Sequence, residues 1–537
     1  MKTKSKILIS ALVVIALCVS LIAGTTFALF SSEDNVNITV SSGKVSVKAT
    51  VGEITKSTSI DGKEPVVEAT VVGGKVTLSK MVPGDRVSFP ISVSNEGTTV
   101  KAAYSVAYEV TEGYLLADGL DIKIEYVNEE NATVDITNGG SYKSYSSAWN
   151  DDVASVYNVT IELPNHADSK IDNLYQGLST SINFAVNAVQ ANGVTIGGEA
   201  VTEALPDYTA IKEAYINGEN VVVTNDIMTM IASKSSSNRL TFKKGIYVLT
   251  GDVSTPQDTT RFRSLGGDVT IDLNGYSFIC NGTSVNPEFV MGQNANLTIK
   301  NGTLKSAAKG GYDYASKTWL KKSVIEAGHG NTLTLKGVNI DSNGTPVVVM
   351  YDDVTKAVIE DCTINGHGGA YAISTNAENP DVNHVVMKNT IVKNVETGIL
   401  YNVGGTLTVD GCDIQAINQG IIARGGTVNI SNSSISVSAT EDAFADKDWG
   451  SGTNVSYGAL VVGNKNNDSY EYETNLELNN VTLEAGGNVA ALYVWGHKNI
   501  DYPTEINYQN VNVKGNAFVH GNKVTLDGTP IVDGGNN

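Results

Sequence analysis

An eight-residue pattern recurs through the C-terminal half of the chain and restricts the possible folds more than any other feature. It reads LTLKGVNI at 333–340, LTVDGCDI at 407–414 and LELNNVTL at 476–483. Most intervals between copies run from the high teens to the mid thirties. Each copy alternates apolar and polar residues, as a half-buried strand does. One such strand per interval is typical of a parallel β-solenoid in which every copy belongs to one coil.

The columns of the aligned copies predict where the side chains point. The third and eighth columns are apolar in every copy and are expected to face the core, whereas the fourth column is polar and is expected to face water. The third column comprises Ile299, Leu335, Ile359, Met387, Val409, Ile430, Leu478, Tyr508 and Leu526. The eighth column comprises Leu304, Ile340, Ile364, Val392, Ile414, Ile435, Leu483, Val513 and Ile531.

The fifth column contains Asn, Asp or Gly alone, which are the residue types that tolerate left-handed backbone. A bend is therefore expected there in every copy, with Asn side chains able to hydrogen-bond along the stack. The column comprises Asn301, Gly337, Asp361, Asn389, Gly411, Asn432, Asn480, Asn510 and Gly528.

A second strand per coil is visible between the copies, for example PVVVM at 346–350, IIARG at 421–425 and LYVWG at 492–496. Two strands, two bends and a turn per coil without a strict period resemble the right-handed parallel β-helix of the pectate-lyase-like superfamily. The resemblance covers roughly Asp268 to the C-terminus and implies about ten coils. It carries information about the fold and little about function.

The N-terminus has the organisation of a signal peptide: lysines, then an apolar run over 7–21, then small residues with Thr26 and Ala28 at the positions that a signal peptidase reads. Cleavage is predicted between Ala28 and Leu29, with signal peptidase as a partner during export and no stable transmembrane anchor. An uncleaved anchor is the alternative, although the run is short for a membrane span. The sequence GTTFALFS resembles leaders handled by the SipW-type signal peptidase, which implies a secreted protein of a Gram-positive bacterium.

Residues 29–196 alternate as strands separated by Gly, Asn and Pro turns, which predicts an antiparallel, jelly-roll-like β-sandwich. The MVPGD turn at 81–85 and the closing AVNAVQAN at 185–192 resemble the TasA/camelysin family. That resemblance implies self-assembly into extracellular matrix fibres, through donation of an N-terminal strand such as Asn35–Val40. An ordinary intramolecular edge strand is the alternative. Some relatives are classed as metallopeptidases, but the sequence has no HExxH motif, so zinc proteolysis is not expected.

Residues 197–225 are expected to form a linker and a short capping helix from Asp207 to Tyr215, and residues 226–537 to form the β-helix. This helix and the first irregular coil after it are expected to cover the apolar end of the solenoid. The fold class expected for the whole chain is all-β, a sandwich followed by a right-handed parallel β-helix.

The charge and the cysteines exclude several classes of partner. A formal net charge of −20 makes nucleic acid an unsuitable partner. Cys362 and Cys412 share the sixth column two coils apart, about 10 Å at the spacing of parallel strands, which is beyond disulfide reach. Both are expected to be buried thiols, with Cys280 also reduced, and no His is spaced to complete a metal site.

Long insertions at the coil corners are where a solenoid places its binding residues. Trp319, Trp449, Tyr493 and Trp495 lie in or beside them and are candidates to stack on sugar rings. Tyr493 and Trp495 are two residues apart and so point to the same side of one strand. The alternative is that they fill the core or cap a coil.

The charged residues give weaker evidence for a catalytic or metal site than the aromatic residues give for a sugar site. Arg424 could serve as a catalytic or anion-binding base, and pairing with a carboxylate or solvation is the alternative. Asp442, Asp446 and Asp448 could hold calcium, the one cofactor considered, although their spacing does not match an EF-hand loop and favours a solvated acidic loop.

Three functions fit these features. The leader and the sandwich favour a structural or adhesive protein of the cell surface or biofilm matrix, with the β-helix as a display or glycan-contact surface. The alternatives are a carbohydrate-binding protein, and a polysaccharide lyase or glycoside hydrolase. The two enzymes need a positioned base or paired carboxylic acids. The sequence presents neither as a cluster, which favours a non-enzymatic role.

Overall fold

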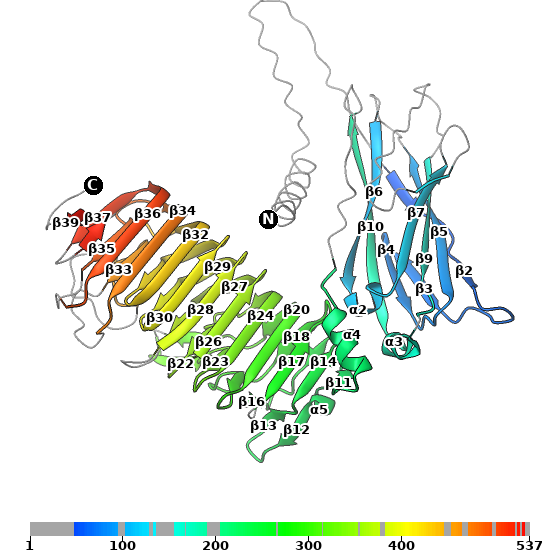
Figure 1. Cartoon of the computed structure of the whole chain (residues 1–537), viewed down its shortest axis with the longest axis horizontal. Coiled ribbons are helices and arrows are strands. Elements are labelled where there is room, and N and C mark those ends of the chain that lie inside the picture. The colour runs from blue at the N-terminus through cyan, green and yellow to red at the C-terminus, as the bar shows by residue number, and fades with distance from the viewer. Residues whose placement is uncertain are drawn as a thin grey trace, which may run out of the picture. The chain divides into compact units, whose positions relative to one another are not determined.

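The computed structural model describes most of the chain in ordered elements. The described residues are 48–94, 102–127, 133–135, 155–166, 168–190, 205–264, 267–313, 315–352, 355–375, 382–444, 453–463, 471–496, 501–520, 524–526 and 529–531. The chain divides into two compact units, residues 1–212 and 213–537, and each is described by itself (Figure 1). The predicted leader, its cleavage site at Ala28 and Leu29, and the proposed donor strand lie outside the described residues. None of the helices formed by the described residues has the length and apolar composition needed to cross a membrane.

The N-terminal unit is an antiparallel β-sandwich, as predicted. One sheet has the order β1-β5-β9-β7-β8 with β2 also on β5, and the other has the order β3-β4-β10-β6. The Phe89 and Phe184 rings, one from each sheet, meet edge to face at 5.4 Å between centroids. Its elements are β1 (Lys48–Val51), β2 (Thr55–Thr58), β3 (Glu68–Val72), β4 (Lys75–Ser79), β5 (Asp85–Ser94), β6 (Ala102–Glu112), α2 (Tyr114–Ala117), β7 (Asp121–Val127), β8 (Thr133–Asp135), β9 (Ser155–Glu162), α3 (Ser169–Tyr175) and β10 (Ser179–Gln190).

The MVPGD turn is held by a buried carboxylate. Asp85 is fully buried, and its Oδ2 accepts hydrogen bonds from the backbone N–H groups of Val66, Val67 and Val82 at 3.2, 3.0 and 3.3 Å. One carboxylate thereby satisfies donors from two chain segments. This explains why an acidic residue ends the turn.

The C-terminal unit is a parallel β-helix, which confirms the predicted fold class. Its elements are α4 (Thr209–Ile216), β11 (Val221–Val223), α5 (Ile227–Met230), β12 (Ile231–Lys234), β13 (Arg239–Phe242), β14 (Gly245–Val248), β15 (Val253–Ser254), β16 (Arg261–Ser264), β17 (Asp268–Asp272), β18 (Ser277–Cys280), β19 (Phe289–Met291), β20 (Asn296–Ser306), β21 (Gly311–Asp313), β22 (Thr318–Lys321), β23 (Ile325–Ala327), β24 (Thr332–Asp341), β25 (Val348–Met350), β26 (Thr355–Glu360), β27 (Thr363–Thr375), β28 (Val382–Lys388), β29 (Ile391–Tyr401), β30 (Gly404–Asp410), β31 (Asp413–Ala423), β32 (Gly426–Val437), β33 (Gly458–Gly463), β34 (Thr474–Glu484), β35 (Ala490–Trp495), β36 (Thr504–Lys514), β37 (Asn516–His520), β38 (Val524–Leu526) and β39 (Thr529–Ile531).

Three parallel stacks of strands run along this unit, whereas the sequence predicted two strands per coil. The first half of the eight-residue pattern stacks in the order β17-β20-β24-β26-β28-β30-β32-β34-β36, and the second strands form the second stack in the order β19-β23-β25-β27-β29-β31-β33-β35-β37. The half of the pattern that follows the fifth-column bend forms the third stack, with pairings in the order β18-β20-β24-β27-β29-β31-β32-β34-β36. Figure 1 shows these strands succeeding one another from β14 to β37. We refer to the second stack as the β19–β37 sheet.

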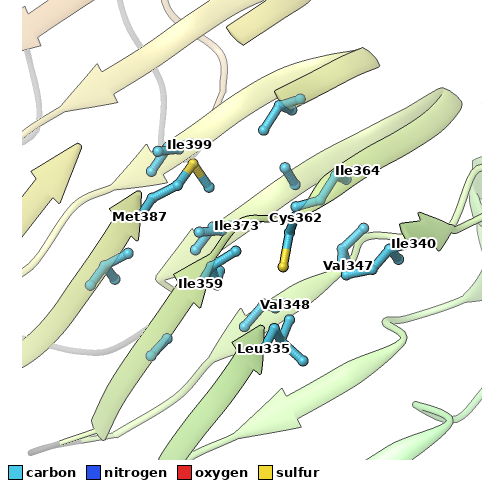
Figure 2. Close-up of a cluster of buried hydrophobic side chains, with 14 of the residues drawn as sticks. Leu335, Ile340, Val347, Val348, Ile359, Cys362, Ile364, Ile373, Met387 and Ile399 are labelled. Atoms are coloured by element: carbon cyan, nitrogen blue, oxygen red, sulfur yellow. The ribbon is translucent and has the colours of Figure 1, made fainter. Parts of the chain in front are cut away.

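The core lies between the stacks, where the third and eighth columns point inward as predicted. Figure 2 shows part of this core, with Leu335, Ile359 and Met387 of the third column among its labelled side chains. Tyr508 and Val513 differ, because they are 49 % and 36 % exposed. Both lie on β36, where the described residues of the following coil pair only with Thr504–Ile506.

The fifth column adopts left-handed backbone, as predicted. The positive φ values run from 46° to 67° over Asn301, Gly337, Asp361, Asn389, Gly411, Asn432, Asn480 and Asn510. The predicted side-chain ladder is also present in part. Asn480 Nδ2 donates to Asn432 Oδ1 at 3.0 Å, and Asn389 Nδ2 donates to Asp361 Oδ1 at 3.0 Å. Each of these two hydrogen bonds therefore links a bend to its neighbour in the stack.

The three described cysteines are buried free thiols. Burial was expected for Cys362 and Cys412, and Cys280 is buried too. Burial raises the pKa of Cys362 and of Cys412 to about 11 each. A buried thiol without a cationic neighbour favours its neutral form and behaves as a small apolar group.

The expected helix at Asp207–Tyr215 is present as α4. The Asp207 carboxylate accepts a hydrogen bond from the Thr209 backbone at 2.9 Å, as an N-terminal capping residue does. Within the N-terminal unit, Lys212 Nζ on this helix lies 2.7 Å from Asp118 Oδ2. Helix α4 spans the division between the two units, and its residues up to Lys212 belong to the N-terminal unit.

The first irregular coil after α4, which was expected to form part of the cap, packs on the solenoid core. Ile227 and Met230 of α5 belong to the same buried cluster as Leu240 and Phe242 of β13. Strands β12 and β13 pair antiparallel there, unlike the coils that follow. The short helix and the antiparallel pair thus cover the apolar end of the solenoid, as was expected of this coil.

Candidate functional site

Four aromatic side chains gather on the outer face of the last two strands of the β19–β37 sheet. Leu492 and Val494 of β35 are buried in the solenoid core, so the residues between and after them, Tyr493 and Trp495, point outward. The parallel register places Phe518 beside Tyr493 and His520 beside Trp495. We call Tyr493, Trp495, Phe518 and His520 the aromatic surface.

The rings of the aromatic surface contact one another across the two coils. The Tyr493 and Phe518 centroids lie 5.8 Å apart, and the Trp495 and His520 centroids lie 4.7 Å apart with an interplanar angle of 32°. Tyr493 and His520 are 5.8 Å apart on the diagonal. All four side chains are half-buried. Ring packing restricts their rotamers and leaves part of each ring for a ligand.

The same outer row is covered on the preceding coils. Leu400, Ile422 and Val461 occupy the row that continues to Tyr493 and Phe518. They are 4 %, 0 % and 0 % exposed and form a small apolar cluster with Val455, against which Tyr493 and Trp495 pack. We call Leu400, Ile422 and Val461 the covered row.

A segment of the long insertion after β32 provides that cover. Gln419 Nε2 donates to the carbonyl oxygens of Thr453 and Val455 at 3.1 and 3.2 Å, and the Thr397 hydroxyl donates to Gln419 Oε1 at 2.8 Å. The predicted corner insertion therefore folds back over its own sheet in the part that is described.

Arg424 directly follows Ala423, the last residue of β31, which pairs with Val462, and the next residue along β33, Gly463, pairs with Trp495. Arg424 is 1 % exposed and is the largest fully buried side chain among the described residues. Its guanidinium therefore does not reach solvent, and a polymer bound at the surface would not contact it. A side chain at Gly463 would collide with the Trp495 carbonyl oxygen, which explains the glycine at this position.

Trp319 lies at a separate place on the solenoid. It belongs to the hairpin β21–β22, where its ring meets Tyr312 edge to face at 5.5 Å and both side chains are 36 % exposed. Figure 1 places β22 among the green strands and β35 and β37 at the red end of the unit. The structure therefore brings Tyr493 and Trp495 together but leaves Trp319 apart.

The calcium candidates are described in part. The Asp442 carboxylate accepts a hydrogen bond from the Phe444 backbone at 2.8 Å. Asp446, Asp448 and Trp449 lie outside the described residues. Within the described ranges, no three His, Cys, Asp or Glu side chains are grouped so that they could hold a metal ion.

A polar groove of about 440 Å³ crosses several coils on another part of the solenoid. Its lining mixes amide, hydroxyl and small side chains with one carboxylate, Glu484, which pairs with Lys514 at 3.1 Å. The lining residues are Asn394, Gln415, Ala416, Ile417, Ser436, Val437, Ser438, Glu484, Ala485 and Gly486. The groove has hydrogen-bonding groups but no aromatic ring.

Sequence reasoning identified Tyr493 and Trp495 but missed Phe518 and His520. Phe518 and His520 lie on the strand AFVHG at 517–521, and their pairing with Tyr493 and Trp495 depends on the register between this strand and LYVWG. An alignment of the second strands in columns, like that of the eight-residue pattern, places Phe518 beside Tyr493.

The chain is similar to solved structures of β-helix enzymes. No protein-family model matches the sequence, and no curated protein matches it. Polygalacturonase from Erwinia carotovora ssp. carotovora is 13 % identical, with 57 % of this chain and 96 % of that chain covered and a TM-score of 0.34. The periplasmic alginate epimerase AlgG is 10 % identical, with 57 % and 82 % covered and a TM-score of 0.34. The catalytic domain of a GH87 α-1,3-glucanase in complex with tetrasaccharides is 12 % identical, with 90 % and 99 % covered and a TM-score of 0.24.

The first two of these proteins are pectate-lyase-like right-handed β-helices. At such identities and TM-scores, a shared activity does not follow from the likeness.

Proposed function

We propose that the chain is a secreted carbohydrate-binding protein that holds a polysaccharide on the aromatic surface of its β-helix. The observation that carries the proposal is the cluster of Tyr493, Trp495, Phe518 and His520 on adjacent coils, with ring centroids 4.7 to 5.8 Å apart across the coils. The leader features at residues 1–28 support export, and the resemblance to TasA/camelysin proteins supports a place at the surface of a Gram-positive cell.

Aromatic rings suit sugars because the C–H face of a pyranose packs on an aromatic face while its hydroxyls remain in water. The aromatic surface offers ring area on two successive coils, so an extended chain could contact both. Rings already held by their neighbours lose little rotamer freedom on binding, which favours affinity.

Binding of purified residues 29–537 to a panel of neutral and acidic polysaccharides tests this proposal. We expect depletion of at least one polysaccharide by the wild-type protein and its loss in Trp495→Ala. Trp319→Ala removes a tryptophan from the separate hairpin and serves as the matched control, which should retain binding. Equal loss in both variants, or no binding to any polysaccharide, would reject the aromatic surface as the site.

The same samples separate binding from catalysis. A binding protein leaves the polysaccharide intact, whereas a lyase releases unsaturated ends and a hydrolase releases reducing ends. Release of either product by the wild-type protein would replace the binding proposal with an enzymatic one.

A second function, assembly into matrix fibres, is favoured by the edge of the sandwich. Strand β1 is the end of its sheet and pairs with β5, and Lys48–Thr50 are exposed, so among the described strands its other edge has no partner. An unpaired edge can accept a strand from a neighbouring molecule.

Electron microscopy of residues 29–537 and of a version beginning after Val40 tests this assembly. Fibres from the longer protein alone would support strand donation by the N-terminal segment. Monomers from both would remove the matrix role and leave glycan binding as the proposal.

A further inference from the structure

A charged pair is buried at the base of the hairpin that carries Trp319. Lys321 ends strand β22, and its Nζ lies 3.0 Å from Glu288 Oε1, with each side chain 3 % exposed. The same Nζ donates a hydrogen bond to the Gly282 carbonyl oxygen at 2.5 Å. The amine is therefore fixed beside the carboxyl group from two directions.

The surroundings of the Glu288 carboxyl group differ at its two oxygens. The Ser306 hydroxyl donates to Oε1 at 2.7 Å. No nitrogen or hydroxyl donor of the described residues reaches Oε2. The Cys280 thiol lies beside the same carboxyl group. Burial raises the pKa of Glu288, opposed by Lys321, so the neutral acid is favoured relative to its state in water.

We propose that Lys321 and Glu288 become joined by an amide bond between Nζ and the Glu288 side-chain carbonyl carbon. A proton first passes from the Lys321 ammonium to the carboxylate, which gives a neutral amine and a neutral acid. Nζ then attacks the carbonyl carbon, with the Ser306 hydroxyl hydrogen-bonded to Oε1 as negative charge develops there. A second proton moves from Nζ to Oε2, the C–Oε2 bond breaks, and one molecule of water leaves. No electrons are transferred to or from the protein.

Position and burial favour this condensation. Two reactants held in contact behave as if at an effective concentration of about 10⁵ M or more when they are well oriented. The reaction also replaces two buried charges by one neutral amide, which removes the desolvation penalty of both ions. The water molecule that forms leaves for the solvent. Hydrolysis of the amide would therefore require water to enter this buried corner of the solenoid again.

The bond would tie the hairpin β21–β22 covalently to the coil that contains β19. The three described cysteines are unpaired, so this cross-link would reinforce the solenoid without a disulfide. The residues between 288 and 321 would form a closed covalent loop, which restricts the unfolded chain as a disulfide does.

Peptide mapping of the purified wild-type protein tests the proposal directly. Tryptic digestion of a cross-linked chain yields peptide 264–300 joined to the peptide that contains Lys321, one water lighter than their sum. Cleavage after Lys321 is blocked by the amide. Recovery of both peptides in linear form, with cleavage after Lys321, would overturn the proposal.

Two variants assign the bond. Lys321→Arg keeps the positive charge but has no amine that can form this amide, so the joined peptide should disappear. Lys322→Ala changes the adjacent exposed lysine and should leave the joined peptide in place. Persistence of the joined peptide in Lys321→Arg would place the link elsewhere and reject the assignment.

Discussion

The outer row of the β19–β37 sheet is apolar along five consecutive strands, yet its two parts have different surroundings. Leu400, Ile422 and Val461 are at most 4 % exposed beneath the segment at 453–455 that Gln419 holds. Tyr493 and Phe518 continue the row but remain half-buried. The covered row therefore stabilises the fold, whereas the aromatic surface keeps ring area for a ligand. Outward apolar residues on a solenoid can serve either purpose, and the corner insertion decides which.

The largest expected effect is on stability, at the covered row. Ile422→Ala leaves a cavity where no solvent enters, and we expect it to lower the free energy of unfolding by about 3 kcal/mol. Urea unfolding followed by circular dichroism measures this. Phe518→Ala, in the same row but half-buried, should cost less. An equal or larger cost at Phe518 would contradict the division of the row into two parts.

The next effect is on binding, at the aromatic surface. Trp495→Ala should weaken polysaccharide binding about tenfold or more, which corresponds to at least about 1.4 kcal/mol. Isothermal titration calorimetry with the polysaccharide that the wild-type protein depletes gives the affinity. Unchanged affinity with lowered stability would mean that Trp495 serves only the apolar cluster.

A smaller effect is expected where the cover is attached. Gln419→Ala removes two hydrogen bonds to the segment at 453–455 and should cost about 1–2 kcal/mol. It should also speed proteolytic cleavage within residues 453–457, followed by mass spectrometry. Gln415→Ala, an exposed glutamine four residues earlier, is the matched control. Equal cleavage rates in the two variants would show that Gln419 does not hold the cover.

The smallest effect at neutral pH concerns two thiols of the solenoid core. The pKa of Cys362 and of Cys412 is about 11 in the folded chain, against an ordinary value of 9.0. Above pH 9 the unfolded chain loses these protons first, so their contribution to stability is complete below pH 9 and is lost as pH rises towards 11. A thiol reagent at pH 8 should label the native protein slowly and the urea-unfolded protein fully. Rapid labelling of native Cys362 would contradict its burial.

Much of the solenoid was predictable because its signals are local and repeated. Apolar columns such as the one containing Leu335 and Ile359 face the core, and the Asn, Asp and Gly column adopts positive φ, because a side chain's alternation and a residue's backbone preference depend on a few neighbours. Repetition then averages over exceptions in single copies. Tyr508 and Val513 are exposed despite belonging to inward columns, since burial also requires a following coil that covers them.

The candidate site was predictable only in part. Tyr493 and Trp495 follow from alternation on one strand, but Phe518 and His520 join them through register between coils. Arg424 has the chemistry of a surface base in the sequence, whereas the structure buries it. The chemical type of each residue was visible, and its accessibility was not.

The sequence by itself determined the coil repeat, the bends and the separate sandwich, because periodicity and turn chemistry are written in adjacent residues. Only the tertiary structure decided which outward residues are covered and where Lys321 meets Glu288. Those outcomes depend on an insertion that folds back over neighbouring coils and on side chains 33 residues apart in the chain, as residues 288 and 321 are. No local pattern specifies such contacts, since they arise only when the stacked coils bring the segments together.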